Sequence, residues 1–147
     1  MPAAKLRAVI DTNVLFEGLT KQGGVCGLIV DAWLNEDFSA CTSMALEYEY
    51  ADVLTRKLSP VRWQKLSTVL GLLLDLAEPT RIYYTWRPSA SDPGDDFLVD
   101  CAMNANALIV TRNVRDFRLA SRDLGIQIQT PEQFAATLTA ALQASAN

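Results

Sequence analysis

Short runs of consecutive apolar residues alternate with amphipathic helical segments along this chain, and this alternation is the strongest constraint on its fold. The runs Ala8–Ile10 and Ala107–Val110 are apolar at every position. Strands of this kind are buried on both faces, which is typical of parallel sheets covered by helices. The sequence therefore predicts an α/β fold: a three-layer α/β/α sandwich with a central parallel sheet of four or five strands.

Capping and turn signals place the expected elements along the chain. Ser43 has the position of a helix N-cap, Pro60 fits the first turn of a helix, and Gly125 marks a helix end. We expect strands at 7–10, 38–42, 81–86, 108–111 and 126–129, and helices at 25–34, 44–57, 60–77, 95–106, 117–124 and 131–143. The glycine-containing segment before residue 25 and the segment 88–94 are expected to be loops.

Length, charge and cysteine content limit the possible classes of protein. The 147 residues fit one domain, 1–147, and the net charge of −4 argues against tight binding of nucleic acid through bulk charge alone. The three cysteines are odd in number and lie among apolar residues, which predicts reduced core thiols in a cytoplasmic protein. The first residues lack the apolar stretch of a signal peptide, and no apolar segment is long enough to span a bilayer.

Carboxylates follow the expected strands in a chain that contains no histidine. Asp11 ends the first apolar run, Asp116 follows a later one, and Asp92, Asp95 and Asp96 lie near the start of a helix. Ligands of parallel sheets bind beyond the carboxyl ends of the strands. Acidic side chains without histidine are a poor zinc or copper site but suit Mg²⁺ or Mn²⁺. The pattern therefore indicates metal-assisted phosphate chemistry.

Each of these residues also has a structural interpretation. Asp11 and Asn13 have the pattern of an Asx turn or helix N-cap, and Asp92 before a proline has that of a turn cap. Asp116 lies among arginines and is able to form a salt bridge with one of them. The same arginines, Arg112 and Arg115 in particular, are alternatively contacts for the phosphates of a substrate.

A helical wheel separates some of the acidic residues from one another. Glu47 and Glu49 border the apolar stripe of their helix from opposite sides, so the wheel does not choose between them. Asp95 shares the apolar stripe of the next acidic helix, whereas Asp96 shares a face with Asp100 that is expected to be solvated. Asp95 is therefore the better ligand, and Asp96 the better partner for the helix dipole.

Taken together, the motifs of this chain resemble those of a PIN domain, the metal-dependent ribonuclease fold that includes VapC-like toxins of bacterial toxin–antitoxin pairs. The resemblance covers residues 6 to about 134. The motifs are Val9-Ile-Asp-Thr-Asn-Val-Leu15, Ser43-x-x-Leu-x-x-Glu-Tyr-x-x-Val-Leu54, Asp92-Pro-Gly-Asp-Asp96 and Ile109-Val-Thr-Arg-Asn-Val-Arg-Asp-Phe117. They occur in the order that the family has.

The resemblance assigns roles to particular residues. The family's four acidic positions, which are both catalytic and metal-binding, fall on Asp11, Glu49, Asp95 and Asp116. Thr111 matches the hydroxyl residue that orders this cluster. Secondary roles fall on Asn13, Asp92, Asp96 and Asn113. Because many PIN domains have aspartate where this chain has Asn113, a neutral and weaker ligand, the number of bound ions stays open between one and two.

The implied reaction is hydrolysis of RNA phosphodiester bonds by water, assisted by Mg²⁺ or Mn²⁺. The resemblance further implies RNA as substrate, an antitoxin protein as possible partner, and a homodimer. A PIN scaffold that binds RNA or protein without cleaving is the alternative, which Asn113 keeps open. A phospho-acceptor signalling domain is disfavoured, because Thr12 follows Asp11 and the last lysine is Lys65.

Overall fold

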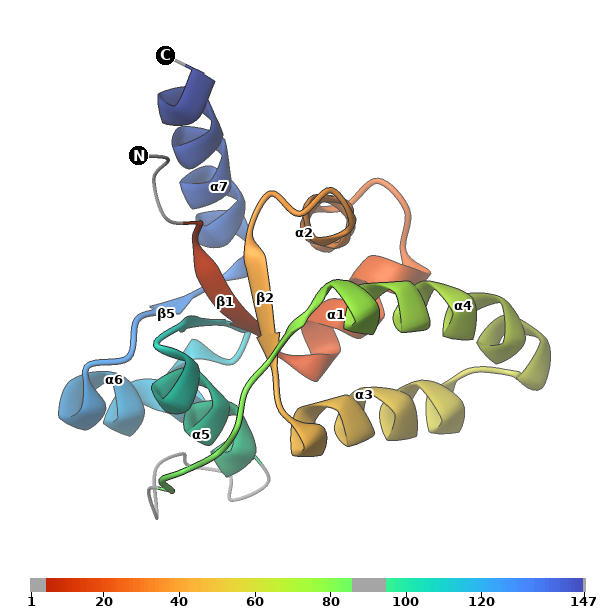
Figure 1. Cartoon of the computed structure of the whole chain (residues 1–147). Coiled ribbons are helices and arrows are strands. Elements are labelled where there is room, and N and C mark those ends of the chain that lie inside the picture. The colour runs from red at the N-terminus through yellow and green to blue at the C-terminus, as the bar shows by residue number, and fades with distance from the viewer. Residues whose placement is uncertain (1–4, 86–94, 147) are drawn as a thin grey trace.

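A five-stranded, all-parallel sheet forms the centre of the computed structural model, which describes residues 5–85 and 95–146 (Figure 1). The strands are β1 (Arg7–Ile10), β2 (Ser39–Thr42), β3 (Glu78–Pro79), β4 (Leu108–Val110) and β5 (Ile128–Gln129). The helices are α1 (Thr12–Thr20), α2 (Val25–Leu34), α3 (Met44–Lys57), α4 (Pro60–Leu76), α5 (Asp96–Ala105), α6 (Arg118–Leu124) and α7 (Pro131–Ala146), with a 3₁₀ turn η2 (Val114–Phe117).

Helices lie on both sides of this sheet. Helix α5 packs across β1, β2 and β4, while α1 packs against both α2 and α3 on the other side (Figure 1). Helix α4 lies beside α2 and α3, and α7 packs against α2. This arrangement confirms the predicted α/β fold with a parallel sheet of five strands. In the part of the chain that the structure describes, no helix is both long and apolar enough to cross a membrane.

The strand order is β3-β2-β1-β4-β5, so the chain moves outward in one direction from β1 and in the opposite direction from β4. The point where the direction reverses, between β1 and β4, is where doubly wound folds bind ligands. The register pairs Ile10 with Val110 at the ends of these two strands. Asp11 and Thr111, the next residues along each strand, therefore lie side by side at this edge.

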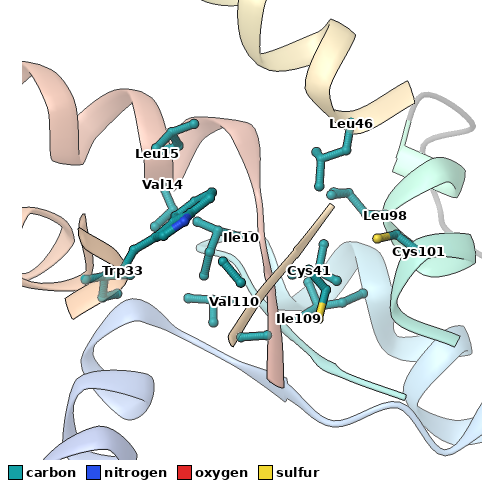
Figure 2. Packing of buried hydrophobic residues seen from close by; sticks show 14 of the residues in the cluster. Ile10, Val14, Leu15, Trp33, Cys41, Leu46, Leu98, Cys101, Ile109 and Val110 are labelled. Atoms are coloured by element: carbon teal, nitrogen blue, oxygen red, sulfur yellow. The ribbon is translucent and has the colours of Figure 1, made fainter. Parts of the chain in front are cut away.

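The hydrophobic core surrounds the end of β1. Figure 2 shows Ile10 of β1 among side chains from α1, α2 and β4, with Leu46 and Leu98 approaching from α3 and α5. Trp33 is buried, and its indole Nε1 donates a hydrogen bond to the carbonyl of Leu73, 2.9 Å away. The three cysteines are free and buried, as the sequence predicted.

Most predicted elements are present close to their expected bounds. The N-cap at Ser43 is confirmed, since its Oγ accepts a hydrogen bond from the amide of Leu46 at 3.3 Å. Gly125 ends α6 in the left-handed conformation, with φ 73°. Strand β5 is shorter than predicted, and α7 continues to Ala146.

The loop predicted before residue 25 is shorter than expected, because helix α1 occupies its first part and only residues 21–24 form turns and bends. Gly18, one of the glycines on which that prediction rests, lies inside α1 at its crossing with α2. A Cβ atom at this position would come within 2.5 Å of the Cys26 carbonyl oxygen and 2.6 Å of a Val30 methyl group. Gly18 is therefore required by close helix packing.

The strand predicted at 81–86 lies earlier in the chain, at Glu78–Pro79. The paired residues are Glu78 and Pro79, where Cys41 and Thr42 of β2 are their partners. The following residues to position 85 are outside regular structure, and residue 86 and the expected loop at 88–94 lie outside the described residues. The aromatic and β-branched residues after position 80 favour a strand, but β2 ends at Thr42, so they have no strand to pair with on that side.

Candidate functional site at the β1–β4 edge

Asp11 and Thr111 form the centre of the candidate site. Asp11 is 6% exposed, and the Thr111 hydroxyl donates a hydrogen bond to its Oδ2 at 2.7 Å. The Thr111 Oγ1 also accepts a hydrogen bond from the amide of Asn113 at 3.0 Å. The Asp11 amide donates to the carbonyl of Val110, also at 3.0 Å. Backbone and side chain of Asp11 are therefore both held by the end of β4.

The environment of Asp11 disfavours its charge. Burial raises the pKa of this carboxyl, the hydrogen bond from Thr111 and the nearby amides of Thr12 and Asn13 oppose that rise, and the charge of Asp116 adds to it. Asp11 occupies the N-cap position of α1, but its carboxylate makes no capping hydrogen bond of regular geometry to that helix. A buried carboxylate beside a second one is a site that a cation would stabilise.

Asp116 lies on η2, half-buried, and its charge acts on Asp11. The alternative of a salt bridge between Asp116 and a neighbouring arginine is not borne out, because no ion pair of Asp116 forms within the described ranges 5–85 and 95–146. Arg112 pairs instead with Glu17 at 2.7 Å and with Glu132 at 3.1 Å. This leaves the Asp116 carboxylate available at the edge of the sheet.

The two arginines proposed to contact substrate differ in their surroundings. Arg112 joins α1 to the start of α7 through its two carboxylate partners, which raise its pKa further. Arg115 is exposed and forms no ion pair with the residues described. The sequence did not reveal the partners of Arg112, because Glu17 is 95 residues away along the chain.

Helix α3 carries two half-buried glutamates close to the same edge. Glu47 Oε1 accepts a hydrogen bond from the Thr42 hydroxyl at 3.1 Å, which ties it to the end of β2. Glu49, the glutamate that matches the family motif, has no ion pair among the residues that the structure describes. The structure thus gives Glu47 a partner in the fold, and Glu49 is not engaged in this way.

Helix α5 departs from the helical-wheel prediction. Asp95 occupies its N-cap position and is half-buried, but Asp96 and Asp100 are buried at 6% and 4% exposure. The expectation that their face is solvated was wrong. Asn104, four residues after Asp100, accepts hydrogen bonds from the amides of Tyr83 and Tyr84, so the segment after β3 contacts α5 near its end.

Two of the four predicted acidic ligands interact in the structure, and the topology brings the other two to the same edge. The charge of Asp116 helps to raise the pKa of Asp11. Glu49 lies in the second turn of α3, which follows β2, and Asp95 precedes α5, which runs antiparallel to the sheet and so begins at its carboxyl edge (Figure 1). Asp92 lies outside the described residues.

The residues present fit a hard divalent cation by their chemistry. Within residues 5–85 and 95–146, no three His, Cys, Asp or Glu side chains form a group able to hold a metal ion. Mg²⁺ does not need such a cage, since it keeps several waters and is commonly bound through one or two carboxylates together with substrate phosphates. Asp11 and Asp116 supply two carboxylates, and carboxylate oxygens are ligands that Mg²⁺ prefers.

A family model for the PIN domain matches residues 7–115 of this chain. The chain belongs to the PIN domain family. Members of this family are typically nucleases and generally metal-dependent. The matched residues include β1, β4 and the Asp11–Thr111 pair.

Solved structures share the fold of this chain. A chain of FitAcB from Neisseria gonorrhoeae is 20% identical, with a TM-score of 0.61, covering 85% of this chain and 98% of its own. A chain of FitAB bound to an IR36 DNA fragment is 17% identical, with a TM-score of 0.60, covering 84% and 94%. A chain of VapBC2 from Rickettsia felis, bound to a promoter DNA fragment, is 12% identical, with a TM-score of 0.58, covering 85% and 98%. No curated protein sequence matches the chain.

Tyr50 lies near the site, and the sequence motif that contains it predicted no role for it. It is fully buried on α3, and its hydroxyl donates a hydrogen bond to the carbonyl of Ile10, the residue before Asp11. The sequence signal was the tyrosine itself, a polar side chain on an apolar stripe. A buried tyrosine hydroxyl usually has a hydrogen-bond partner, but the sequence does not identify that partner.

Proposed function

We propose that this protein is an endoribonuclease that hydrolyses RNA phosphodiester bonds with the help of Mg²⁺ or Mn²⁺, and that it is the toxin of a toxin–antitoxin pair. The observation that carries the proposal is the buried Asp11 carboxylate at the β1–β4 edge. It accepts a hydrogen bond from Thr111, and the charge of Asp116 acts on it, in a chain of the PIN family. Burying this charge beside a second one is costly for the folded protein unless a cation binds there.

Asp11, Glu49, Asp95 and Asp116 are the proposed ligands and catalytic carboxylates. A bound divalent ion supplies activation of water and neutralisation of charge on the departing oxygen. Thr111 fixes which oxygen of Asp11 faces the site, since its hydroxyl occupies Oδ2. Because the chain has no histidine, the proposed general base is a carboxylate of this site or the metal-bound water itself.

The residues around these carboxylates have supporting roles in this proposal. Asn13 and Asn113 are neutral polar groups beside Asp11 and Thr111, and Asp96 supports the start of α5. Arg115 is the proposed phosphate contact, because it is exposed and without an ion pair in the described chain. Arg112 acts mainly by holding α1 and α7 together at the edge of the site.

The partner proposed for this chain is an antitoxin protein, with a homodimer of the chain itself as the assembled form. Support comes from the similar solved structures, two of which are complexes with DNA, one of them with DNA from the promoter of the pair. A small reading frame beside the gene, whose product abolishes cleavage when co-purified, is the expected finding. Cleavage that persists in the co-purified complex would contradict this part of the proposal.

The second candidate function is a PIN scaffold that binds RNA or protein without cleaving it. Two observations favour it: Asn113 replaces a charged ligand, and the described side chains include no group of three metal-binding residues. In that case Asp11 and Thr111 would serve only to join β1 to β4.

An RNA cleavage assay separates the two candidates. Wild type is incubated with a structured RNA in Mg²⁺, Mn²⁺, Ca²⁺ or EDTA, together with Asp11→Asn and the matched control Asp75→Asn, an exposed aspartate of α4. We expect cleavage in Mg²⁺ or Mn²⁺ by wild type and Asp75→Asn, and none in EDTA or by Asp11→Asn. Equal cleavage by wild type and Asp11→Asn, or none by wild type, would refute the ribonuclease proposal.

A further inference from the structure

Tyr50 connects helix α3 to the residue pair that begins the candidate site. Its side chain is 0% exposed, and its hydroxyl donates a hydrogen bond to the Ile10 carbonyl oxygen. That carbonyl belongs to the same peptide group as the Asp11 amide, which donates to the Val110 carbonyl at 3.0 Å. The peptide group in front of Asp11 is thus held at both ends, by α3 through Tyr50 and by β4 through Val110.

The Ile10 carbonyl needs a partner other than β2. The pairing of β1 with β2 runs from Arg7↔Ser39 to Ala8↔Ala40, and β2 ends at Thr42 before the chain turns into α3. Ile10 is 1% exposed, so water does not satisfy its backbone. A buried carbonyl without a donor is costly. The Tyr50 hydroxyl replaces the strand at this position.

We propose that Tyr50 is a positioning residue, which locks the end of β1, and with it Asp11, to the helix that carries Glu49. The proposal rests on the proposed metal-dependent function of that edge. Glu49 is the residue before Tyr50, so a fixed Tyr50 side chain sets the distance between α3 and Asp11. On the other side, Thr111 fixes the Asp11 carboxylate itself. Asp11 and Glu49 are then held at a fixed distance from each other before a metal ion binds.

The hydroxyl group of Tyr50 is the part that the proposal requires. Its aromatic ring packs against Trp33, with 6.4 Å between ring centroids, and phenylalanine would retain this contact. Burial is the main cause that raises the pKa of Tyr50 well above its usual value, so the hydroxyl keeps its proton and stays a donor at any ordinary pH. Its role is therefore to hold the backbone, and proton transfer is not part of it.

Tyr50→Phe tests the proposal, with Tyr48→Phe as its matched control. Tyr48→Phe removes a hydroxyl from the same helix, but that side chain is 75% exposed. The readouts are the Kd for Mn²⁺ of each protein and the hydrogen-exchange rates of the Asp11 and Ile109 amides. The Ile109 amide, bonded to the Gln127 carbonyl, reports on the sheet as a whole.

We expect Tyr50→Phe to bind Mn²⁺ about tenfold more weakly than wild type, as when other groups that support a metal ligand are removed. The Asp11 amide should exchange faster while Ile109 changes little. Tyr48→Phe should leave the Kd for Mn²⁺ and both exchange rates unchanged. An unchanged Kd for Mn²⁺ in Tyr50→Phe, or equal acceleration at Asp11 and Ile109, would overturn the positioning role.

The exchange readout separates this proposal from the proposed function. If wild type binds no Mn²⁺, the metal-dependent function fails, and with it the role of Tyr50 in holding metal ligands at one spacing. In that case, selectively faster hydrogen exchange of the Asp11 amide in Tyr50→Phe would support only the role of Tyr50 in holding the backbone. If Tyr50→Phe does not fold, replacement of tyrosine by 3-fluorotyrosine keeps the hydroxyl and makes it a stronger donor. Exchange at Asp11 should then slow relative to Ile109, and a relative acceleration would contradict the lock.

Discussion

Replacing Asp11 by asparagine should abolish cleavage without destabilising the metal-free protein. The substitution preserves the shape of the side chain and removes its charge. The carboxylate is 6% exposed and faces the charge of Asp116, so its pKa is raised above the usual value, mainly by burial. A carboxyl group with a higher pKa in the folded than in the unfolded chain lowers stability as the pH rises through that interval. At neutral pH the ionised Asp11 therefore costs stability, and asparagine removes this cost.

The opposing effect is the loss of charged hydrogen bonds. The Thr111 hydroxyl donates to Asp11 Oδ2, and the asparagine oxygen still accepts that bond as a neutral partner. Hydrogen bonds to a charged group contribute about 1.5–3 kcal/mol and neutral ones about 1 kcal/mol, so the loss is on the order of 1 kcal/mol. We expect the two effects to cancel or to favour asparagine slightly. Because about 1 kcal/mol corresponds to a shift of about 2–4 °C at this chain length, the Tm in EDTA should be equal or up to about 4 °C higher.

Thermal melts with and without Mn²⁺ measure both parts of this prediction. At a hundred times the Kd, wild type should gain about 2.7 kcal/mol from the bound ion. This gain corresponds to about 5–11 °C, whereas Asp11→Asn should gain less than half of it. Thr111→Val is the companion variant, which leaves the buried carboxylate without its hydroxyl partner and should lose about 1–3 kcal/mol. A Tm of Asp11→Asn in EDTA clearly below that of wild type would mean that Asp11 is mainly a structural cap.

Three further predictions concern the surroundings of the site. Asp95→Asn should lose at least about tenfold more cleavage activity than Asp96→Asn, whereas Asp96→Asn should lower the Tm more, because Asp96 is buried. Equal losses of activity would refute the separation of their roles. Arg112→Gln should lower the Tm by a few degrees through its two ion pairs, and Arg115→Gln should weaken RNA binding at an unchanged Tm, as melts and fluorescence anisotropy would measure. Burial is the main cause that raises the pKa of Cys26 and Cys41 to about 11 and of Cys101 to about 12, so a thiol reagent at pH 8 should modify them only after unfolding; rapid modification of the native protein would contradict the structure.

The order of strands and helices was predictable because it depends on local patterns of apolar residues. Ser43 and Gly125 gave correct helix ends, since a cap acts within a few residues of itself. Helix α1 was missed because a glycine such as Gly18 is found both in flexible loops and where two helices cross closely. Here the close contact with Cys26 and Val30 of α2 requires the glycine, and this contact is not visible in the local sequence.

The candidate site was predictable in part for the same reason. Asp11 and Thr111 follow strands that pair with each other, so the topology alone brings them together. The burial of Asp96 and Asp100 was not predictable, because a local pattern of residues does not show which distant segments pack against a helix face; Asn104 of α5, for example, binds the amides of Tyr83 and Tyr84, about twenty residues away. Contacts between distant segments determine which acidic side chains remain available to bind a metal ion, and local sequence patterns do not predict these contacts.

The central claim is that the edge between β1 and β4 is a metal site built on Asp11. Substoichiometric Mn²⁺ added to ¹⁵N-labelled protein tests it most directly, because the paramagnetic ion broadens the amide signals of residues close to it. The account predicts selective broadening of the amides of Asp11, Thr12, Asn113 and Asp116 in wild type and in Asp75→Asn, and its loss in Asp11→Asn. Broadening centred elsewhere, or equal broadening in Asp11→Asn, would contradict it.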